Sequence, residues 1–187
     1  MKKVKEYQGF KTNIFLCLLF VMLFSSVLPS QVFADVTKKD FQVIARSIGF
    51  LNNLPKGEET FTIVYDPSIQ SSQDEARTLK EMFSKKKSIK GLKIRTQFVP
   101  IQHLSEIGAP KFIFVASNLG QHHAYINQIA QRNKTLSITL DRSCVESGNC
   151  ILYINTDKRV DITVNKAAAE RANIQFAPVF MVMVTTL

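Results

Sequence analysis

Two aspartates and several small polar residues are the first candidates for chemistry. Asp66 and Asp141 each follow a run of apolar residues, and two carboxylates could act as an acid and a base or hold a ligand amine. The other polar residues in such positions are Ser68, Ser117, Asn118 and Arg142. Turn chemistry is the alternative explanation for Asp66 and Asp141, because aspartate commonly ends strands. The candidate ligand-binding residues are therefore Asp66, Ser117, Asn118, Asp141 and Arg142.

The adjacent histidines His122 and His123 invite a metal-binding or general-base interpretation. Neighbouring residues of a helix point about 100° apart, so the pair cannot easily share one ion. Both histidines fall in the first turns of an expected helix, which favours solvated surface side chains. His103 stands alone on a short amphipathic segment and indicates no role.

The motifs of well-known catalytic sites are missing from the sequence. It contains no G-x-S-x-G, no G-x-x-x-x-G-K-[ST] and no H-E-x-x-H, and it has only 7 glycines. Together with the histidines, this absence favours a protein that is not an enzyme and that carries no metal or cofactor. An uncharacterised hydrolase stays open on the strength of the His and Asp residues alone.

Cys144 and Cys150 form the second candidate pair. They are six positions apart, and in an oxidising compartment such a pair is most simply a disulfide, which would contribute about 2 kcal/mol by closing a short loop in the unfolded chain. A metal or redox pair is the alternative, although C-x-x-C spacing would favour that more than C-x5-C does.

The first 34 residues predict an oxidising compartment because they resemble a cleavable secretory signal. Lysines precede an apolar run from Ile14 to Leu28, Pro29 breaks it, and short side chains lead to a cleavage site after Ala34. The run has 15 residues, fewer than the roughly 20 that cross a bilayer, although an uncleaved anchor is the alternative. A lipoprotein signal is disfavoured, because Leu16 before Cys17 is too bulky.

Cleavage would leave residues 35–187 as one domain of 153 residues, long enough to bury a core. The leader accounts for +3 of the formal charge of +9, so the domain is moderately basic, near +6. Nucleic acid is an improbable partner outside the cytoplasm, whereas acidic partner proteins or anionic surfaces suit this charge.

Helical and strand patterns alternate along the domain. Helices are expected over residues 38–51, from a Ser72–Glu75 capping box onward, over 102–107 and 119–132, and after Asn165. Strands are expected over residues 61–65, 92–99, 111–116, 135–140, 151–155 and 160–164. The continuously apolar strand at 111–116 is typical of a central strand covered on both faces.

This order predicts a single three-layer α/β domain with a mostly parallel central sheet flanked by helices. Residues 151–164 would form a C-terminal antiparallel hairpin at one edge of the sheet, and residues 176–184 an apolar tail. Ligands of open parallel sheets bind beyond the carboxyl ends of the strands, so the candidate residues would share one rim.

The last third of the chain resembles the YfiR-like periplasmic family. Residues 135–154 (T-L-S-I-T-L-D-x-x-C-V-x-x-G-x-C-I-L-Y-I) are similar to the family's "vLTVSD…GG.I.F" segment. Residues 159–168 and 172–176 are similar to its "vNldAA" and "aGlkisS" runs, and residues 112–116 match the place of an apolar strand of the family. Residues 48–50 and 62–66 fit its opening helix and first strand more loosely. The chain departs from the family where it has L-N-N-L-P at 51–55 instead of "F..WP", and Gly148-Asn149 instead of Gly-Gly.

The resemblance implies a periplasmic, dimeric, disulfide-bearing protein that holds the sensor domain of an inner-membrane diguanylate cyclase inactive. It also implies a disulfide between Cys144 and Cys150, which match the family's C-terminal pair. The leading hypothesis is a non-catalytic regulator that binds a cyclase or histidine kinase and responds to redox state or a ligand. A small solute-binding module using the rim is the second hypothesis.

Overall fold

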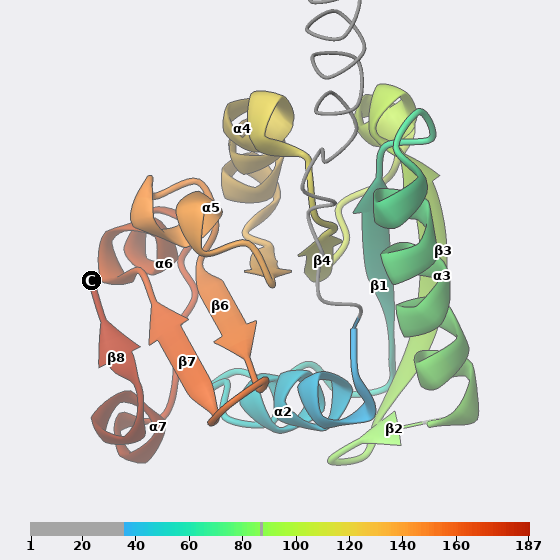
Figure 1. Ribbon diagram of the computed structural model, residues 1–187. Helices are drawn as coiled ribbons and strands as arrows, with labels where there is room; N and C mark the ends of the chain where they lie inside the picture. Colours follow the sequence, from blue (N-terminus) through green and yellow to red (C-terminus); the bar gives the residue numbers. More distant parts are fainter. Residues whose placement is uncertain (1–35, 87) are drawn as a thin grey trace, which may run out of the picture. The chain divides into compact units, whose positions relative to one another are not determined.

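The computed structural model describes residues 36–86 and 88–187, in which helices and strands alternate (Figure 1). The predicted leader, residues 1–34, lies outside the described residues, so its cleavage after Ala34 stays a prediction. The first elements are α2 (Lys38–Ile48), β1 (Glu58–Tyr65), α3 (Gln70–Lys85), β2 (Ser88–Ile89), β3 (Leu92–Pro100), the 3-10 helix η1 (Ile101–Glu106) and β4 (Phe112–Val115). They are followed by η2 (Gly120–His122), α4 (His123–Asn133), β5 (Leu136–Thr139), α5 (Arg142–Glu146), β6 (Leu152–Asn155), β7 (Asp161–Val164), α6 (Lys166–Arg171), α7 (Pro178–Met183) and β8 (Thr185–Thr186).

The strands form one eight-stranded sheet in the order β2-β3-β1-β4-β5-β6-β7-β8. Strands β3, β1, β4, β5 and β6 are parallel, and β6 and β7 form an antiparallel hairpin. The predicted α/β class with a mostly parallel sheet is therefore confirmed. The predicted C-terminal antiparallel hairpin is also present, but it is not the outermost part of the sheet, because β8 pairs in parallel with β7 and takes the outer position.

Helices cover both faces of this sheet. On one face the ring of Phe83 in α3 lies 4.2 Å from that of Phe61 in β1, measured between centroids. The strand register places Tyr153 of β6 on the opposite face, where Arg142 of α5 lies 5.0 Å from its ring. The three predicted layers are thus helix, sheet and helix.

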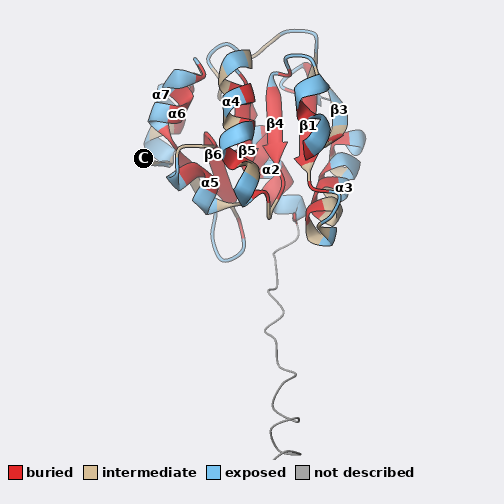
Figure 2. Ribbon diagram, turned by 90° about the horizontal axis from the view of Figure 1, so that it is seen from above, coloured by how far each residue is buried: buried red, intermediate tan, exposed pale blue. Residues whose placement is uncertain are grey.

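The central position of β4 follows from its composition. All four residues from Phe112 to Val115 are buried, and β1 and β5 flank the strand (Figure 2). An uninterrupted apolar run suits a strand that is covered on both faces, as the sequence predicted.

The predicted capping box at Ser72 and Glu75 is wrong. Helix α3 begins at Gln70, and its capping residue, Ile69, makes no side-chain hydrogen bond. Both Ser72 and Glu75 are buried, and they accept hydrogen bonds from the backbone N–H groups of Asp66 and Ser117, just beyond the ends of β1 and β4. A capping box does occur at α2, where the side chains of Thr37 and Asp40 bind each other's backbone N–H.

Candidate functional site

The candidate site lies where β1, β4 and β5 end, and we call Asp66, Ser117, Asn118 and Asp141 the rim. Helix α3 leaves β1 on one face of the sheet, and α5 leaves β5 on the other. In open α/β sheets, ligands bind where connections diverge in this way. Strand β4 separates β1 from β5, so Asp66 and Asp141 follow strands that lie about 10 Å apart.

Asp66 is buried at the end of β1 and organises the turn into α3. Its Oδ1 accepts hydrogen bonds from the N–H and the hydroxyl of Ser68, at 2.8 and 2.7 Å. Its own N–H donates to Oγ of Ser72 at 3.1 Å. The two bonds from Ser68, and to a lesser extent the nearby His122, lower the pKa of Asp66 against the opposing effect of burial. One carboxylate oxygen of Asp66 is thus already bound by the chain itself.

Glu75 connects α3 to the end of β4. Its Oε2 accepts a hydrogen bond from the backbone N–H of Ser117, and the residue is 2 % exposed. Next to it, Nδ2 of Asn118 donates to Oγ of Ser71 at 2.9 Å, with Asn118 in the left-handed region at φ 66°. Side chains of α3 therefore occupy the crevice between the ends of β1 and β4. This role of Glu75 was not predicted from its sequence position, although Glu75 precedes Leu79 and Phe83 at four-residue spacing, which marks the buried face of the helix.

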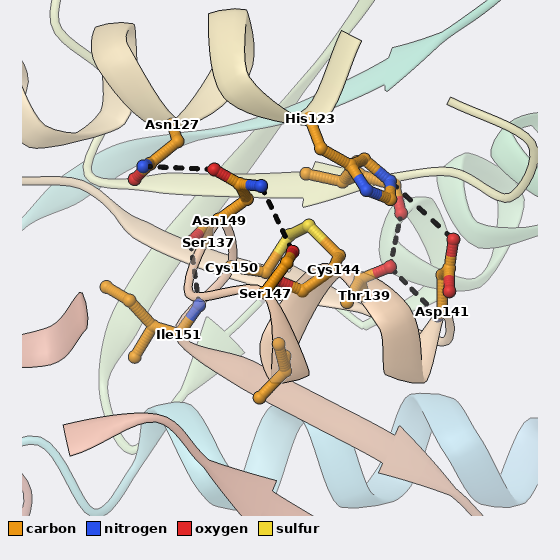
Figure 3. Close-up of a disulfide and its surroundings, with 12 residues drawn as sticks. His123, Asn127, Ser137, Thr139, Asp141, Cys144, Ser147, Asn149, Cys150 and Ile151 are labelled. Atoms are coloured by element: carbon orange, nitrogen blue, oxygen red, sulfur yellow. Dashed lines mark hydrogen bonds and ion pairs between the residues drawn. A yellow bond between two sulfur atoms is a disulfide. The ribbon is translucent and has the colours of Figure 1, made fainter. Parts of the chain in front are cut away.

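Asp141 caps α5, and like Asp66 it binds the serine two residues later in the chain. Its Oδ1 accepts from the N–H and hydroxyl of Ser143 at 2.9 and 2.7 Å, and its own N–H donates to Oγ1 of Thr139. Its Oδ2 lies 3.6 Å from Nε2 of His123 (Figure 3). Each aspartate of the rim therefore serves a local turn.

His123 is 5 % exposed, so the prediction of a solvated surface histidine is wrong for this residue. Its ring points toward Thr139 and Asp141 from the first turn of α4, whereas His122 is half-buried (Figure 3). Burial lowers the pKa of His123, with Asp141 opposing and His122 adding to this effect. Its Nε2 makes no hydrogen bond within the described chain.

Arg142 does not join the other candidate residues. Its guanidinium lies 2.9 Å from Asp161 in β7 and 3.7 Å from Glu146, and it covers the ring of Tyr153. The hydrogen bond to Asp161 is the main cause that raises the pKa of Arg142. The structure therefore brings Ser117, Asn118 and Asp66 close to α3, places Asp141 beside His123, and turns Arg142 toward β7.

Cys144 and Cys150 form a disulfide, with Sγ atoms 2.00 Å apart and Cα atoms 5.2 Å apart. Both cysteines are fully buried, and Cys144 lies in α5 rather than in a loop. The N–H groups of Asn149 and Cys150 both donate to the carbonyl of Cys144 at 2.9 Å. Residues 144–150 therefore form a closed, internally bonded corner, which we call the disulfide corner.

The disulfide corner is attached to two neighbouring elements. Nδ2 of Asn165, which precedes α6, donates to the carbonyl of Val145, and Arg171 of α6 donates to that of Gly148, both at 2.9 Å. From α4, Nδ2 of Asn127 donates to Oδ1 of Asn149 at 3.3 Å (Figure 3). A rearrangement of this corner would therefore alter its hydrogen bonds to α4 and α6.

Two cavities lie away from the rim. One of about 210 Å³ is lined by Glu59, Thr60, Arg95, Gln97 and residues 108–110, and one of about 300 Å³ lies beside α6 and α7.

Within residues 36–86 and 88–187, no cluster of three His, Cys, Asp or Glu side chains could hold a metal ion. In the same residues, no helix is long and apolar enough to cross a membrane.

Solved structures of other α/β proteins share the fold. Three solved structures are similar, each at 15% sequence identity. The first is an ABC domain from Streptococcus pneumonia in complex with L-Trp, with a TM-score of 0.59 and coverage of 79% of this chain and 60% of that chain. The second is a conserved domain protein of Vibrio cholerae O1 biovar El Tor, with a TM-score of 0.58 and coverage of 82% and 61%. The third is the ligand-free, open structure of a substrate-binding protein with adhesive properties from Clostridium difficile, with a TM-score of 0.59 and coverage of 83% and 60%. The chain thus spans about three fifths of the length of these proteins, and at this identity the likeness concerns the fold alone.

Comparison of the sequence with known families identifies the family of this chain. The YfiR/HmsC-like family matches residues 53–183, most of the described chain, and the protein belongs to that family. No curated protein matches the sequence significantly. The resemblance seen in residues 135–176 is therefore confirmed as membership.

Proposed function

We propose that the chain is a non-catalytic periplasmic regulator that binds the periplasmic domain of an inner-membrane signalling protein, either a diguanylate cyclase or a histidine kinase. Family membership over residues 53–183 carries this proposal, because YfiR-like proteins are periplasmic regulators of a cyclic-di-GMP pathway. A cleavable leader at residues 1–34 would deliver the domain to that compartment.

The arrangement of the rim supports a regulator more than a solute-binding module. Groups that would meet a ligand between β1 and β4 are already bound within the chain: the N–H of Ser117 donates to Glu75, and the side chain of Asn118 donates to that of Ser71. The similar structures include substrate-binding proteins, but the chain spans only about three fifths of their length. A thermal-shift screen with nucleotides, amino acids and sugars tests the solute-binding alternative.

The disulfide corner supports a redox response. Reduction of Cys144–Cys150 would release a corner that α4 and α6 both contact, so an oxidised and a reduced chain would present different surfaces. If the double variant Cys144→Ser/Cys150→Ser binds its partner as the wild type does, the redox response is refuted.

A homodimer is part of the proposal, and α7 offers the surface for it. Val179, Val182 and Met183 of α7 and the nearby Leu187 are 48–87% exposed. No charged residue occurs between Arg171 and Leu187, in a chain with a formal charge of +9. Two copies can therefore meet here without like-charge repulsion, which favours a second copy over a charged partner.

Co-purification tests the regulatory function directly. The full chain, tagged at its C-terminus and exported in its native host, should co-purify from solubilised membranes with a protein that carries a cyclase or kinase domain. Charge-matched tagged periplasmic proteins serve as the control. Recovery of the chain without any membrane signalling protein would contradict the proposal.

A further inference from the structure

The outer edge of β3 is open beyond its first two residues. Strand β2 pairs only with Leu92 and Lys93, whereas β3 continues to Pro100, and no described strand pairs with this edge farther along. The N–H of Lys93 donates inward to the carbonyl of Gly57 at 2.8 Å. Because backbone groups alternate along a strand, those of Ile94, Thr96 and Phe98 point outward. Figure 1 shows β3 at the margin of the sheet, with α3 over one face.

Positive side chains flank this open edge on both faces. Lys93 and Arg95 are exposed on the face opposite α3, and Nζ of Lys80 in α3 lies 5.3 Å above the ring of Phe98. The ring of Phe98 in turn stacks on Tyr65 at 3.9 Å, which fixes this end of the edge. Two carboxylates lie near these cations. Glu58 is 3.8 Å from Arg95 at a mostly exposed site, and Glu59 lines the same cavity as Arg95. Three cations thus stand against two carboxylates, and the edge carries net positive charge.

The cavity of about 210 Å³ opens on the same side as Arg95. Arg95 and Gln97 of β3 line it together with the backbone-rich segment 108–110 and with Glu59 and Thr60. A strand laid against β3 would direct every second side chain toward this face. A carboxylate on such a side chain would meet the guanidinium of Arg95.

We propose that the open edge of β3 binds an extended acidic segment of a partner protein as an additional strand. Main-chain hydrogen bonds to Thr96 and Phe98 would supply affinity, and Lys80, Lys93 and Arg95 would select acidic side chains. A second copy of the chain is disfavoured here, because two such edges would bring Lys93 and Arg95 of both copies together. The proposal rests on the proposed function in one respect, since it assigns to the signalling partner the acidic segment that this edge would bind.

A peptide titration of the exported, purified chain tests the proposal without the signalling partner. The probe is a capped seven-residue peptide of alternating Glu and Val, and its counterpart has Lys in place of Glu. Amide hydrogen exchange at Thr96 and Phe98 should slow at least tenfold with the Glu peptide and stay unchanged with the Lys peptide. Lys93→Glu with Arg95→Glu should weaken binding at least tenfold, and Thr96→Pro, which removes an outward N–H, should do so with the charges intact.

The matched control is Lys158→Glu with Arg159→Glu, an equal charge change on the exposed hairpin turn. Equal weakening by this control, binding that leaves Thr96 and Phe98 unprotected, or no binding at all would overturn the proposal. Each of these results concerns the edge alone, because the partner is absent. The regulatory function is judged separately by co-purification, which fails or succeeds independently of the peptide.

Discussion

Oε2 of Glu75, on the buried face of α3, accepts a hydrogen bond from the backbone N–H of Ser117 at the end of β4. A carboxylate of the chain itself thus takes the place where related folds hold ligands. The space between the ends of β1 and β4 therefore contributes to the internal cohesion of the domain. This contact supports the proposed regulatory function over the binding of small solutes.

Removal of the Glu75 carboxylate should destabilise the domain. Glu75→Ala leaves the N–H of Ser117 without this acceptor, and the loss of a hydrogen bond to a charged group costs about 2 kcal/mol. The free energy of unfolding is measured by urea denaturation. Glu81→Ala, on the exposed side of the same helix, is the matched control and should change stability by less than about 0.5 kcal/mol. Equal stability of the two variants would show that the crevice contact is dispensable.

The disulfide should contribute mainly by restricting the unfolded chain. Cys144→Ser with Cys150→Ser should lower the free energy of unfolding by about 2 kcal/mol, the value expected for so short a loop. Wild type denatured with excess reductant should show the same loss, and the double variant should not respond to reductant. A response of the double variant would place the redox sensitivity outside this bond.

The buried His123 should make stability depend on pH between about 7 and 5. Because burial lowers its pKa in the folded state, the unfolded chain binds this proton more readily once the pH falls below about 6.5. The free energy of unfolding should therefore fall with decreasing pH, by at most about 1.4 kcal/mol per pH unit from this one group.

His123→Gln should flatten that dependence, whereas His103→Gln, at an exposed site beside Glu106, should leave it intact. Denaturation at several pH values measures both variants. The lowered pKa of Asp66 affects stability at a lower pH. The ionised Asp66 stabilises the folded state above about pH 4, and this stabilisation is lost only as the pH falls further. A pH slope that persists in His123→Gln would assign the effect to another group.

A charge on α7 should break the homodimer. Val182 is 87% exposed, so Val182→Lys leaves the fold intact and places a cation in the uncharged surface. Light scattering coupled to gel filtration should show a dimer for wild type and a monomer for this variant. Val160→Lys, on the hairpin, introduces the same charge elsewhere and should stay dimeric. A wild-type monomer would refute the dimer, and a dimeric Val182→Lys would refute the α7 surface.

The fold could be predicted where composition alone decides burial. The apolar run of β4 indicated a central strand, and Asn165 was predicted to cap α6, where its Oδ1 accepts from the N–H of Ala168 at 2.8 Å. Strands β2 and β8 were missed, because two residues carry no periodicity and such strands depend on their neighbours.

The site was harder to predict, because tertiary contacts decide it. Ser72 and Glu75 fit a capping box locally, yet their burial against β1 and β4 determines what they bind. Which of His122 and His123 points inward depends on the residue at which α4 begins. The 3-10 helix at Gly120–His122 makes α4 begin at His123, later than the predicted start at residue 119. Arg142 was placed on the rim by position in the chain, but the pairing of β6 with β7 brings Asp161 within its reach.

If the chain is exported and regulates a membrane signalling protein, as we propose, the cellular concentration of cyclic-di-GMP should respond to its loss. Deletion of the chain from its native host should raise the nucleotide severalfold, if the partner is a diguanylate cyclase held inactive. Expression of residues 1–187 should restore the low level, while residues 35–187, lacking the leader and confined to the cytoplasm, should not. Unchanged cyclic-di-GMP on deletion, together with no membrane signalling protein in the co-purification, would contradict the account.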